Sequence, residues 1–358
     1  MARERVAVAL SGGVDSSVAA ALLLDQGYDV IGLTMHLWRE MSLPAQTENT
    51  SPEHPVEKAR RVADVLQIPF HVIDAQAPFK HHVVEPFVAG YAAGLTPNPC
   101  LLCNRHIKFG YLLQMAANLG ADRLATGHYA RTRLGLDGKT WQLLKGVDPS
   151  KDQSYVLYML GQSELSQAIF PLGEWTKDQV RKMARERGLP SAYSQESQDL
   201  CFLPDNDYRR FLRQVVPEAF TPGPILDTDG HEIGRHKGLA SYTIGQRSGI
   251  GIAAPEALYV LGLDAERNAL LVGPRRALGR NSLAAHSVRW VSGQPPSGPI
   301  AAIVKIRYKA RPIRATIVPL PDERAQVLLS EPLPDVTPGQ GVVFYDDELV
   351  LGGGVIAR

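Results

Sequence analysis

The sequence predicts an α/β protein: an N-terminal domain built on a parallel sheet, then a small β-rich central domain and a C-terminal β-barrel. Up to residue 216, short apolar runs alternate with segments of helical period, which is typical of parallel strands joined by crossover helices. Pro217 and the turn at residues 221–224 then interrupt the chain. Beyond residue 225, short strands and glycine turns replace the helical period. We therefore divide the 358 residues into domains at 1–216, 217–279 and 280–358.

The elements of the first domain are predicted to alternate between strand and helix. Strands are expected at residues 6–10, 29–34, 70–73 and 123–126, helices from Val14 and at 56–66, 79–93, 104–119, 176–188 and 207–215, a hairpin at 131–144, and a loop at 39–55. Six short strands are expected between residues 287 and 356. Ligands of parallel sheets bind beyond the carboxyl ends of the strands, so residues 11–17, Met35 and Gly127 should border one crevice.

The loop Ser11-Gly12-Gly13-Val14-Asp15-Ser16-Ser17 separates the first strand from the first helix. Its glycines permit a tight turn, and the helix N-terminus behind it favours an anion. Asp15 is a suitable ligand for a Mg²⁺ ion held on phosphate oxygens. Neither Gly-x-x-x-x-Gly-Lys-Ser/Thr nor Gly-x-Gly-x-x-Gly follows this strand. The loop instead resembles the PP-loop of ATP pyrophosphatases, which transfer AMP to a substrate oxygen; a serine-rich helix cap without a ligand is the alternative.

Charge and composition restrict the partners. Lys and Arg total 38 against 37 Asp and Glu, so a polyanion must be met by a local basic patch. Residues 267–320 contain no acid and ten basic residues: Arg267, Arg275, Arg276, Arg280, Arg289, Lys305, Arg307, Lys309, Arg311 and Arg314. Lys305, Arg307 and Lys309 have strand spacing, so we expect them on one face, against nucleic-acid phosphates or solvent. Without a long apolar run or a signal peptide, a cytoplasmic enzyme with no membrane partner is expected.

Three cysteines lie in polar turns. Cys100 and Cys103 follow Thr96-Pro97-Asn98-Pro99 at a predicted helix start, and Cys201 stands alone about a hundred residues later. Because a helix N-terminus lowers thiol pKa values, at least one of the first pair is expected to be partly thiolate near pH 7. A structural zinc site needs four ligands and is disfavoured by the lack of a second Cys-x-x-Cys. A redox dithiol and three ordinary buried thiols remain possible.

Motifs along nearly the whole chain point to one family. They are Ser-Gly-Gly-Val-Asp-Ser-Ser, Thr-Pro-Asn-Pro-x-x-x-Cys-Asn-Arg-x-Ile-Lys-Phe, Thr-Gly-His-Tyr-Ala, Lys-Asp-Gln-Ser-Tyr, Ser-Gln-Asp-x-Cys-Phe, Tyr-Thr-Ile-Gly-Gln-Arg and Thr-Pro-Gly-Gln, in that order. Together they resemble those of bacterial tRNA-specific 2-thiouridylases. Argininosuccinate synthase, GMP synthase and tRNA-lysidine synthase share the PP-loop, but the two cysteine motifs do not fit them.

The resemblance implies a role for each matching residue. ATP would be bound by Ala9, Leu10, Ser11, Gly12, Gly13, Val14, Asp15, Ser16, Met35 and Gly127. Asn98, Pro99 and Cys100 would face the target base, and His128, Lys151, Asp152, Gln153, Arg307, Tyr308 and Gln340 would contact tRNA. Cys103 would be the nucleophile and Cys201 the persulfide carrier. Many members carry aspartate at the position of Cys100, and a thiol hydrogen-bonds more weakly than a carboxylate.

The implied reaction is the ATP-dependent 2-thiolation of the wobble uridine in the anticodon arm of tRNA. AMP from ATP, held with Mg²⁺, would activate the C2 oxygen of an extruded base. A sulfur carried on Cys201 would replace that oxygen, ending in a Cys103–Cys201 disulfide. A cysteine desulfurase or a sulfur-relay protein would supply the sulfur. Two alternatives stay open: a [4Fe–4S] cluster on the three cysteines, or a non-catalytic tRNA-binding module with a vestigial ATP loop.

Overall fold

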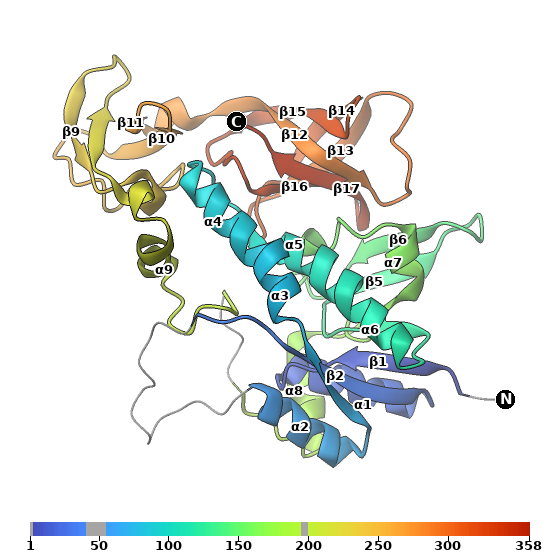
Figure 1. Ribbon diagram of the computed structural model, residues 1–358. Coiled ribbons are helices and arrows are strands. Elements are labelled where there is room, and N and C mark those ends of the chain that lie inside the picture. Colours follow the sequence, from blue (N-terminus) through green and yellow to red (C-terminus); the bar gives the residue numbers. More distant parts are fainter. Residues whose placement is uncertain (1–2, 41–54, 195–199) are drawn as a thin grey trace.

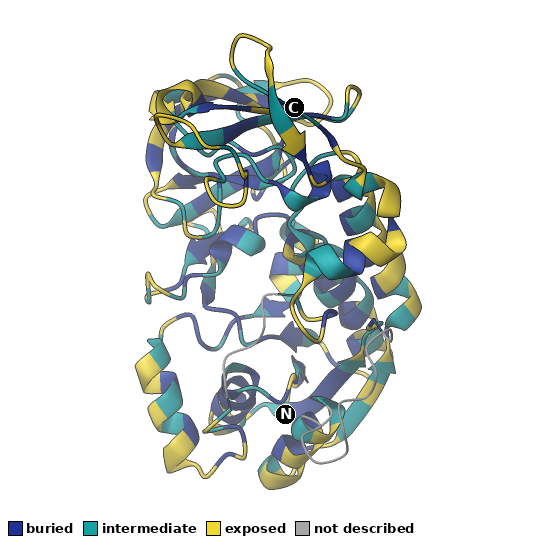
Figure 2. Cartoon of the chain, turned by 90° about the vertical axis from the view of Figure 1, so that its left-hand side faces the viewer, coloured by how far each residue is buried: buried dark blue, intermediate teal, exposed yellow. Residues whose placement is uncertain are grey.

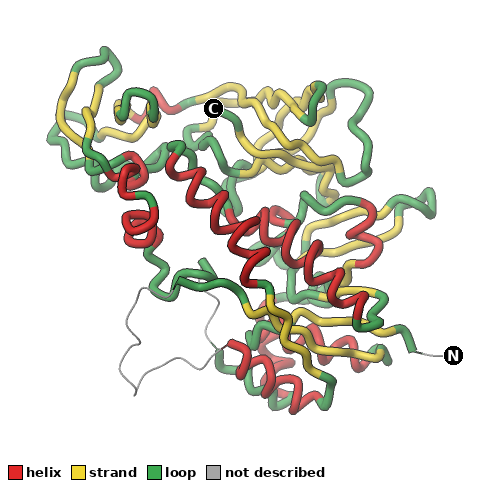
Figure 3. The backbone as a smooth tube through the Cα atoms, viewed as in Figure 1, coloured by secondary structure: helices red, strands yellow, loops and turns green. Residues whose placement is uncertain are grey.

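The computed structural model describes residues 3–40, 55–194 and 200–358. The N-terminal domain lies at the bottom of Figure 1 and the C-terminal barrel at the top, with the small central domain beside the barrel. Helices of the N-terminal domain run diagonally between the two larger parts (Figure 3). The predicted loop at 39–55 falls almost wholly outside the described residues, as do residues 197–199 of the Cys201 motif.

A five-stranded parallel sheet in the order β3-β2-β1-β4-β7 forms the centre of the N-terminal domain. Its strands are β1 (Arg5–Ala9), β2 (Asp29–His36), β3 (Phe70–Asp74), β4 (Arg123–Ala125) and β7 (Ala168–Ile169). Val6, Ala7 and Val8 of β1 are completely buried, as expected for a parallel strand covered on both faces. The predicted parallel-sheet domain is therefore confirmed.

The chain order of this sheet creates a crossover point beside β1. From β1 the chain passes outward through β2 and β3, then returns to the other side of β1 as β4. The connections that leave the carboxyl ends of β1 and β4 therefore separate in opposite directions. A crevice at such a point is where open α/β sheets bind their ligands. The helix α1 (Val14–Asp25) begins there, flanked by α2 (Pro55–Leu66) and α8 (Lys177–Glu186).

Two long helices between the sheet and the barrel contain π-helical segments. The first comprises α3 (Gln76–Phe79), η1 (Lys80–Val84) and α4 (Glu85–Ala92); the second comprises α5 (Pro99–Leu102), η2 (Cys103–Leu112) and α6 (Leu113–Asn118). Both helices were predicted, but starting three to five residues later than they do. The π-helical segments within them were not predicted. In a π-helix the backbone bond joins residues i and i+5, so residues five apart lie near one face.

The predicted hairpin forms as β5 (Ala130–Leu134) and β6 (Trp141–Lys145), and it is not part of the parallel sheet. β6 pairs with the last strand of the chain, β17 (Leu349–Ile356), through Leu144 opposite Leu349 and Leu143 opposite Val350. The hairpin therefore extends the barrel sheet from within the N-terminal domain. Short helices follow it: η3 (Ser154–Val156), α7 (Gln162–Gln167) and, beyond α8, α9 (Tyr208–Val215).

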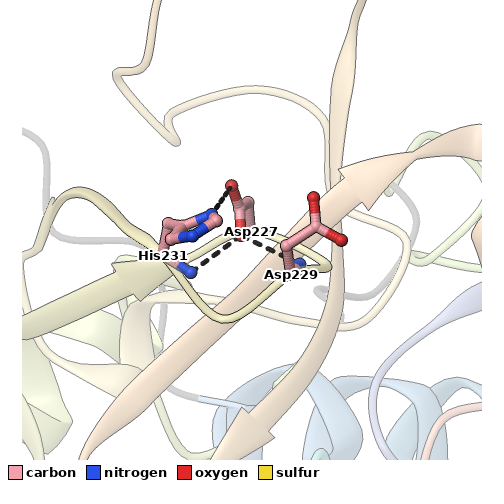
Figure 4. A group of neighbouring side chains, drawn as sticks. All are labelled: Asp227, Asp229 and His231. Atoms are coloured by element: carbon pink, nitrogen blue, oxygen red, sulfur yellow. Dashed lines mark hydrogen bonds and ion pairs between the residues drawn. The ribbon is translucent and has the colours of Figure 1, made fainter.

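The central domain is a four-stranded sheet, β8 (Gly223–Leu226), β9 (Glu232–His236), β10 (Leu258–Asp264) and β11 (Ala269–Pro274). Asp227, Asp229 and His231 gather in the turn between β8 and β9 (Figure 4). The Asp227 carboxylate accepts hydrogen bonds from the backbone N–H groups of Asp229 and His231, both at 2.9 Å. This group of potential metal ligands is thus accounted for as the closure of a hairpin turn.

The C-terminal domain is a closed six-stranded barrel, as predicted. Its strands are β12 (Arg280–Trp290), β13 (Ile300–Lys305), β14 (Ile313–Leu320), β15 (Arg324–Leu333), β16 (Gly341–Asp346) and β17. Pairing between β12 and β17 closes the sheet on itself. Closure removes the exposed edges that a short antiparallel sheet otherwise presents.

The N-terminal domain and the barrel share one hydrophobic core. Tyr155 and Tyr158 of the N-terminal domain and Tyr345 of the barrel are all completely buried in it. The Tyr155 hydroxyl donates a 2.8 Å hydrogen bond to the carbonyl oxygen of Gly341 in β16. Figure 2 shows buried stretches, in dark blue, in both the N-terminal domain and the barrel. The barrel is therefore packed onto the N-terminal sheet domain as part of its core.

Replacing Tyr155 tests this shared core. Tyr155→Ala should lower the free energy of unfolding by about 3–5 kcal/mol, as for other large buried aromatics. Tyr155→Phe should cost about 1–3 kcal/mol, because it leaves the buried Gly341 carbonyl without its donor. Urea denaturation followed by tryptophan fluorescence and far-UV circular dichroism should give one common transition. Two separate transitions, with only one moved by the substitutions, would contradict a shared core.

Candidate active site

The loop after β1 is tied into a fixed shape by its own serines. Ser16 Oγ accepts the backbone N–H of Ser11 at 3.1 Å and donates to the carbonyl oxygen of Gly13 at 3.2 Å. Ser17 Oγ also donates to the Gly13 oxygen, at 2.8 Å. Gly13 is the N-cap of α1, and the first N–H groups of a helix have no acceptor within it. The loop thus presents preorganised donors at the positive end of a helix dipole, which suits a phosphate.

Two glycines let neighbouring backbone approach this loop closely. Gly12 has φ +75°, and a Cβ there would lie 2.5 Å from Cβ of Lys58 in α2. A Cβ on Gly127, just after β4, would lie 2.8 Å from the backbone nitrogen of Ser16. Both predicted ATP-site glycines are therefore sterically required, since any side chain would push the loop away from β4 or α2. Ala9 ends β1 and Met35 lies near the end of β2, at the same edge of the sheet.

Asp15, the predicted metal ligand, is held by two residues that the sequence reasoning missed. Lys177 Nζ lies 2.7 Å from both carboxylate oxygens, and the Tyr129 hydroxyl donates to Oδ1 at 2.8 Å. The Lys177 side chain is only 12% exposed. Burial and the Asp15 charge raise the pKa of Tyr129, which keeps its hydroxyl protonated as a donor. One sequence signal was available: Lys177 follows the helix cap Thr176 directly, where the helix dipole disfavours a cation.

The residues around Asp15 suit Mg²⁺ in their chemistry, since a carboxylate and serine hydroxyls are oxygen ligands. Both carboxylate oxygens are engaged by the Lys177 ammonium, however. A Mg²⁺ ion at this carboxylate would compete with the ammonium for the same two oxygens, and the two cations would repel each other. The predicted magnesium site therefore depends on a second residue.

His128 lies in the interior, which bears on its predicted contact with tRNA. Its side chain is 6% exposed and stands between Thr126 Oγ1, 2.7 Å from Nδ1, and Lys108 Nζ, 3.3 Å from Nε2. Burial and the Lys108 charge hold its pKa well below the usual value. Because an ammonium only donates, Nε2 of the neutral ring accepts and Nδ1–H donates to Thr126. In this conformation the ring lies beneath the surface that an RNA would touch.

The fold brings the three cysteines together, all as free thiols. Cys100 is exposed in the first turn of α5, where its backbone N–H donates to Asn98 Oδ1 at 3.1 Å. Cys103 is partly buried one turn later, at the start of η2. Cys201 lies in an exposed turn beside Phe202, which is 1% exposed within an aromatic cluster that Cys103 also contacts. Cys100 and Cys201 are both close enough to raise the pKa of Cys103.

The expectation of a partial thiolate from the helix N-terminus is wrong for Cys103. Its pKa is raised to about 12, mainly by burial and to a smaller extent by the neighbouring thiols. Desolvation also raises the pKa of Cys201. The side chain that opposes both shifts is Lys108, a residue that the sequence reasoning did not single out. It lies five residues after Cys103 in the π-helical segment, so the i→i+5 winding brings the ammonium to the face of the thiol.

Several residues predicted to contact tRNA also make contacts within the protein. The buried Asp152 carboxylate accepts from the backbone N–H groups of Gly146 and Ser154, and Gln153 Oε1 accepts from that of Tyr129. Gln340 Nε2 donates to the Thr96 carbonyl at 2.8 Å.

Arg307 and Tyr308 lie at the seams between domains. Arg307 donates to the Ile244 carbonyl of the central domain and to the Thr337 hydroxyl, and the Tyr308 ring packs edge-on to Tyr155 with centroids 6.4 Å apart. Together with Gln340, they border the junctions of the barrel with both other domains.

The basic tract differs from its prediction in two ways. Strand β13 ends at Lys305, so Arg307 and Lys309 lie in the following turn and not on one strand face. Four of the ten residues form ion pairs with acids outside the tract: Arg267 with Asp264, Arg276 with Glu256, Arg289 with Glu323, and Arg311 with Glu331. The absence of acids within the tract therefore does not make it a uniformly basic face. Lys309 and Arg314 are exposed.

Three family models cover almost the entire chain. Residues 4–205 match the tRNA methyl transferase HUP domain, residues 209–274 the tRNA methyl transferase PRC-barrel domain, and residues 280–356 the aminomethyltransferase beta-barrel domain. These matches follow the sheet domain, the four-stranded central sheet and the closed barrel of the structure.

Curated relatives decide the family. The tRNA-specific 2-thiouridylase MnmA of Chloroflexus aurantiacus is 51% identical over 353 residues, covering 99% of this chain and 98% of that protein. The proteins of the same name from Magnetococcus marinus and Roseiflexus castenholzii are 50% and 48% identical, each over 99% of both chains. The chain belongs to the tRNA-specific 2-thiouridylase family. The family and enzyme class predicted from the sequence are thereby confirmed. Within the described residues, no helix is long and apolar enough to cross a membrane.

Removing the Lys108 charge should make Cys103 less reactive. Lys108→Met should raise the pKa of Cys103 further, so that alkylation by iodoacetamide at pH 9 slows about three- to tenfold, as expected when a unit charge is removed near a partly buried thiol. Peptide mass spectrometry resolves the alkylation rate of each cysteine separately. Lys108→Arg should retain most of the reactivity, and Lys182→Met, an exposed site on α8, should change nothing. An unchanged Cys103 rate in Lys108→Met would contradict this electrostatic role.

Proposed function

We propose that this chain catalyses the ATP-dependent 2-thiolation of the wobble uridine of tRNA. The observation that carries the proposal is the pairing of a phosphate-binding loop with three neighbouring free thiols in a member of the 2-thiouridylase family. A thiolation that starts from a carbonyl needs both parts, since the oxygen must be activated and a sulfur must replace it. The family models have methyl transferase in their descriptions, but methyl transfer requires neither a phosphate-binding loop nor a group of thiols.

The first step is activation of the C2 oxygen of uridine. That oxygen attacks the α-phosphorus of ATP, and pyrophosphate leaves. The N–H groups at the start of α1 and the hydroxyl groups of the loop stabilise the charge that develops on the phosphates. Asp15 and the serine hydroxyl groups would hold Mg²⁺, which neutralises phosphate charge. Ala9, Leu10, Met35 and Gly127 would surround the nucleotide at the crossover point of the sheet.

The second step transfers sulfur. The terminal sulfur of a Cys201 persulfide forms a bond to C2 of the activated base. The Cys103 thiolate then attacks Sγ of Cys201, and the bond between the two persulfide sulfurs breaks with its electron pair left on the sulfur at C2. AMP departs as the C2–sulfur double bond forms, and the proton of Cys103 goes to solvent. The resulting Cys103–Cys201 disulfide requires a thiol reductant before the next turnover.

The positions of the cysteines suit these roles. Cys201 is exposed, so a partner persulfide protein, a cysteine desulfurase or a sulfur-relay protein, can reach it. Asn98, Pro99 and Cys100 begin α5 next to Cys103, where a base extruded from the anticodon loop would meet both thiols. Arg307, Tyr308 and Gln340 border the barrel junctions, and Lys151, Asp152 and Gln153 lie in a loop joined to the ATP site; these residues, with His128, remain the proposed tRNA contacts. We place the reaction in the cytoplasm.

Substitution of the cysteines separates the persulfide mechanism from a [4Fe–4S] cluster. Cys103→Ser and Cys201→Ser should each abolish thiolation, measured by mass spectrometry of tRNA nucleosides, because one thiol releases the sulfur that the other carries. Both should retain tRNA-stimulated ATP–pyrophosphate exchange, since adenylation requires only the loop and the base. Cys100→Ser should keep partial thiolation activity, because relatives function with a carboxylate at this position.

Two results would overturn this assignment of the thiols. If Cys100→Ser lost thiolation as completely as the other two variants and anaerobically purified protein contained iron, the cluster mechanism would replace the persulfide. If the wild-type protein bound tRNA but showed neither pyrophosphate exchange nor thiolation with any sulfur donor, the chain would be a binding module.

Exposed basic residues of the barrel should supply part of the tRNA affinity. Lys309→Gln combined with Arg314→Gln should weaken tRNA binding, and the slope of log affinity against log salt should fall by about 0.7–0.9 for each phosphate that the variant no longer neutralises. Filter binding between about 50 and 300 mM KCl measures both the tRNA affinity and its salt slope. Arg276→Gln, whose guanidinium is paired with Glu256, is the matched control and should change the slope less. An unchanged slope in the double variant would mean that these residues face only solvent.

A further inference from the structure

A buried cation stands at the mouth of a phosphate loop that carries no lysine of its own. The loop from Ser11 to Ser17 contains Asp15 as its only charged residue. The cation comes from α8, 162 positions further along the chain, where Lys177 forms two 2.7 Å contacts with the Asp15 carboxylate. The Tyr129 ring also faces this ammonium, with Nζ 5.8 Å from the ring centroid. Neither the family matches nor the names of the relatives assign a role to Lys177.

Charge balance in the loop explains why a cation is needed. A nucleoside triphosphate bound there would place several negative charges beside the Asp15 carboxylate. Like charges at this distance repel strongly in a partly buried site. The helix dipole and loop N–H groups offset only part of that repulsion. An ammonium within reach of both the carboxylate and the phosphates removes the conflict, and Lys177 has a four-carbon stem that can move between them.

The position of Lys177 is set independently of Asp15. Its backbone N–H donates to Asp148 Oδ2 at 2.9 Å, and Thr176 caps the helix with a reciprocal Gln179 contact. Val180 and Ala184 of the same helix are completely buried against α1. The start of α8 therefore stays in place when the side chain changes partner. If the Lys177 ammonium leaves Asp15 for another partner, only the side-chain rotamer of Lys177 has to change, and the helix does not have to move.

We propose that Lys177 is the phosphate-binding cation of this site, held on Asp15 in the nucleotide-free protein and passed to the β- and γ-phosphates when Mg²⁺ takes the carboxylate. This inference rests on the proposed use of ATP. It assigns to one side chain two mutually exclusive partners, and so explains how a single carboxylate serves as an ion-pair partner before binding and as a metal ligand afterwards. It also supplies the lysine that the loop motif lacks.

Equilibrium binding of three probes tests the proposal. We would titrate the intact protein with Mg²⁺ and α,β-methylene-ATP, with Mg²⁺ and inorganic pyrophosphate, and with AMP, by calorimetry. Lys177→Met should weaken the first two by about tenfold or more, the effect of losing a charge-assisted hydrogen bond, and leave AMP within about twofold. Lys177→Arg should recover most of the lost affinity because it keeps the charge. Lys182→Met, on the same helix, is the matched control and should bind all three probes as the wild type does.

The exchange of partners has its own test. Asp15→Asn frees Lys177, so this variant should bind pyrophosphate without Mg²⁺ several-fold more tightly than the wild type. In Asp15→Asn combined with Lys177→Met that gain should disappear. If the gain persists, it comes only from the removed negative charge, and the exchange is wrong.

Other outcomes separate this inference from the proposed function. If Lys177→Met binds pyrophosphate like the wild type, or loses AMP binding equally, Lys177 is a structural partner of Asp15 and the inference falls while ATP use stands. If the wild-type protein binds none of the three probes, the proposed function itself fails. Thermal unfolding of each variant identifies any that are misfolded. If Lys177→Met is one of them, the affinity of Lys177→Arg for the three probes tests the proposal in its place.

Discussion

The Asp15 carboxylate is the contact point on which the geometry of the candidate site depends. It joins Lys177 of α8 and Tyr129, which follows β4, to the loop after β1. The backbone of Tyr129 is in turn held by Gln153, and that of Lys177 by Asp148, whose carbonyl accepts from Lys151. These contacts close a ring from the phosphate loop through residues 148–153 and back. The segment expected to meet tRNA is thus built from the same contacts that shape the ATP site.

The shared core places a second constraint on the site. Leu101 of α5 and Phe109 of η2 pack in the same hydrophobic cluster as Tyr155, Val343 and Tyr345. The position of Cys103, which lies between them in the chain, is therefore fixed by the barrel as well as by the sheet domain. The hairpin β5–β6 reinforces this by completing the barrel sheet from the other domain. A barrel attached only by a linker would let an anticodon arm bind in many orientations. Here the barrel and the thiols belong to one packed body, so an RNA bound as proposed would present its base at a defined place.

Local patterns in the sequence predicted the parallel sheet, the barrel strands and the phosphate loop, because each depends on residues close together in the chain. The sequence could not show where the hairpin at 131–144 would pair, since alternation of polar and apolar residues does not specify the partner strand. The Lys177–Asp15 and Lys108–His128 contacts could not be predicted either. Each joins residues that are far apart in the chain, and the sequence reasoning singled out neither lysine. The π-helical winding of residues 103–112 has no simple periodic signature. The pKa of Cys103 could not be predicted for a related reason: proximity to a helix start is local, whereas the desolvation that raises this pKa comes from tertiary packing.

The raised pKa of the partly buried Cys103 suits the proposed sulfur transfer, in which this thiol must stay reduced until it attacks. Disulfide exchange requires a thiolate, so the desolvation that raises the pKa of Cys103 slows its reaction with an incoming disulfide or oxidant. The same burial would make the enzyme inert if nothing opposed it. Lys108 opposes it for both thiols at once, and His128 holds the ammonium from the interior side at 3.3 Å. A neutral histidine suits this task because a protonated ring would repel the lysine. The environment therefore combines protection of Cys103 with a charge, that of Lys108, that would stabilise either thiolate in the proposed sulfur transfer.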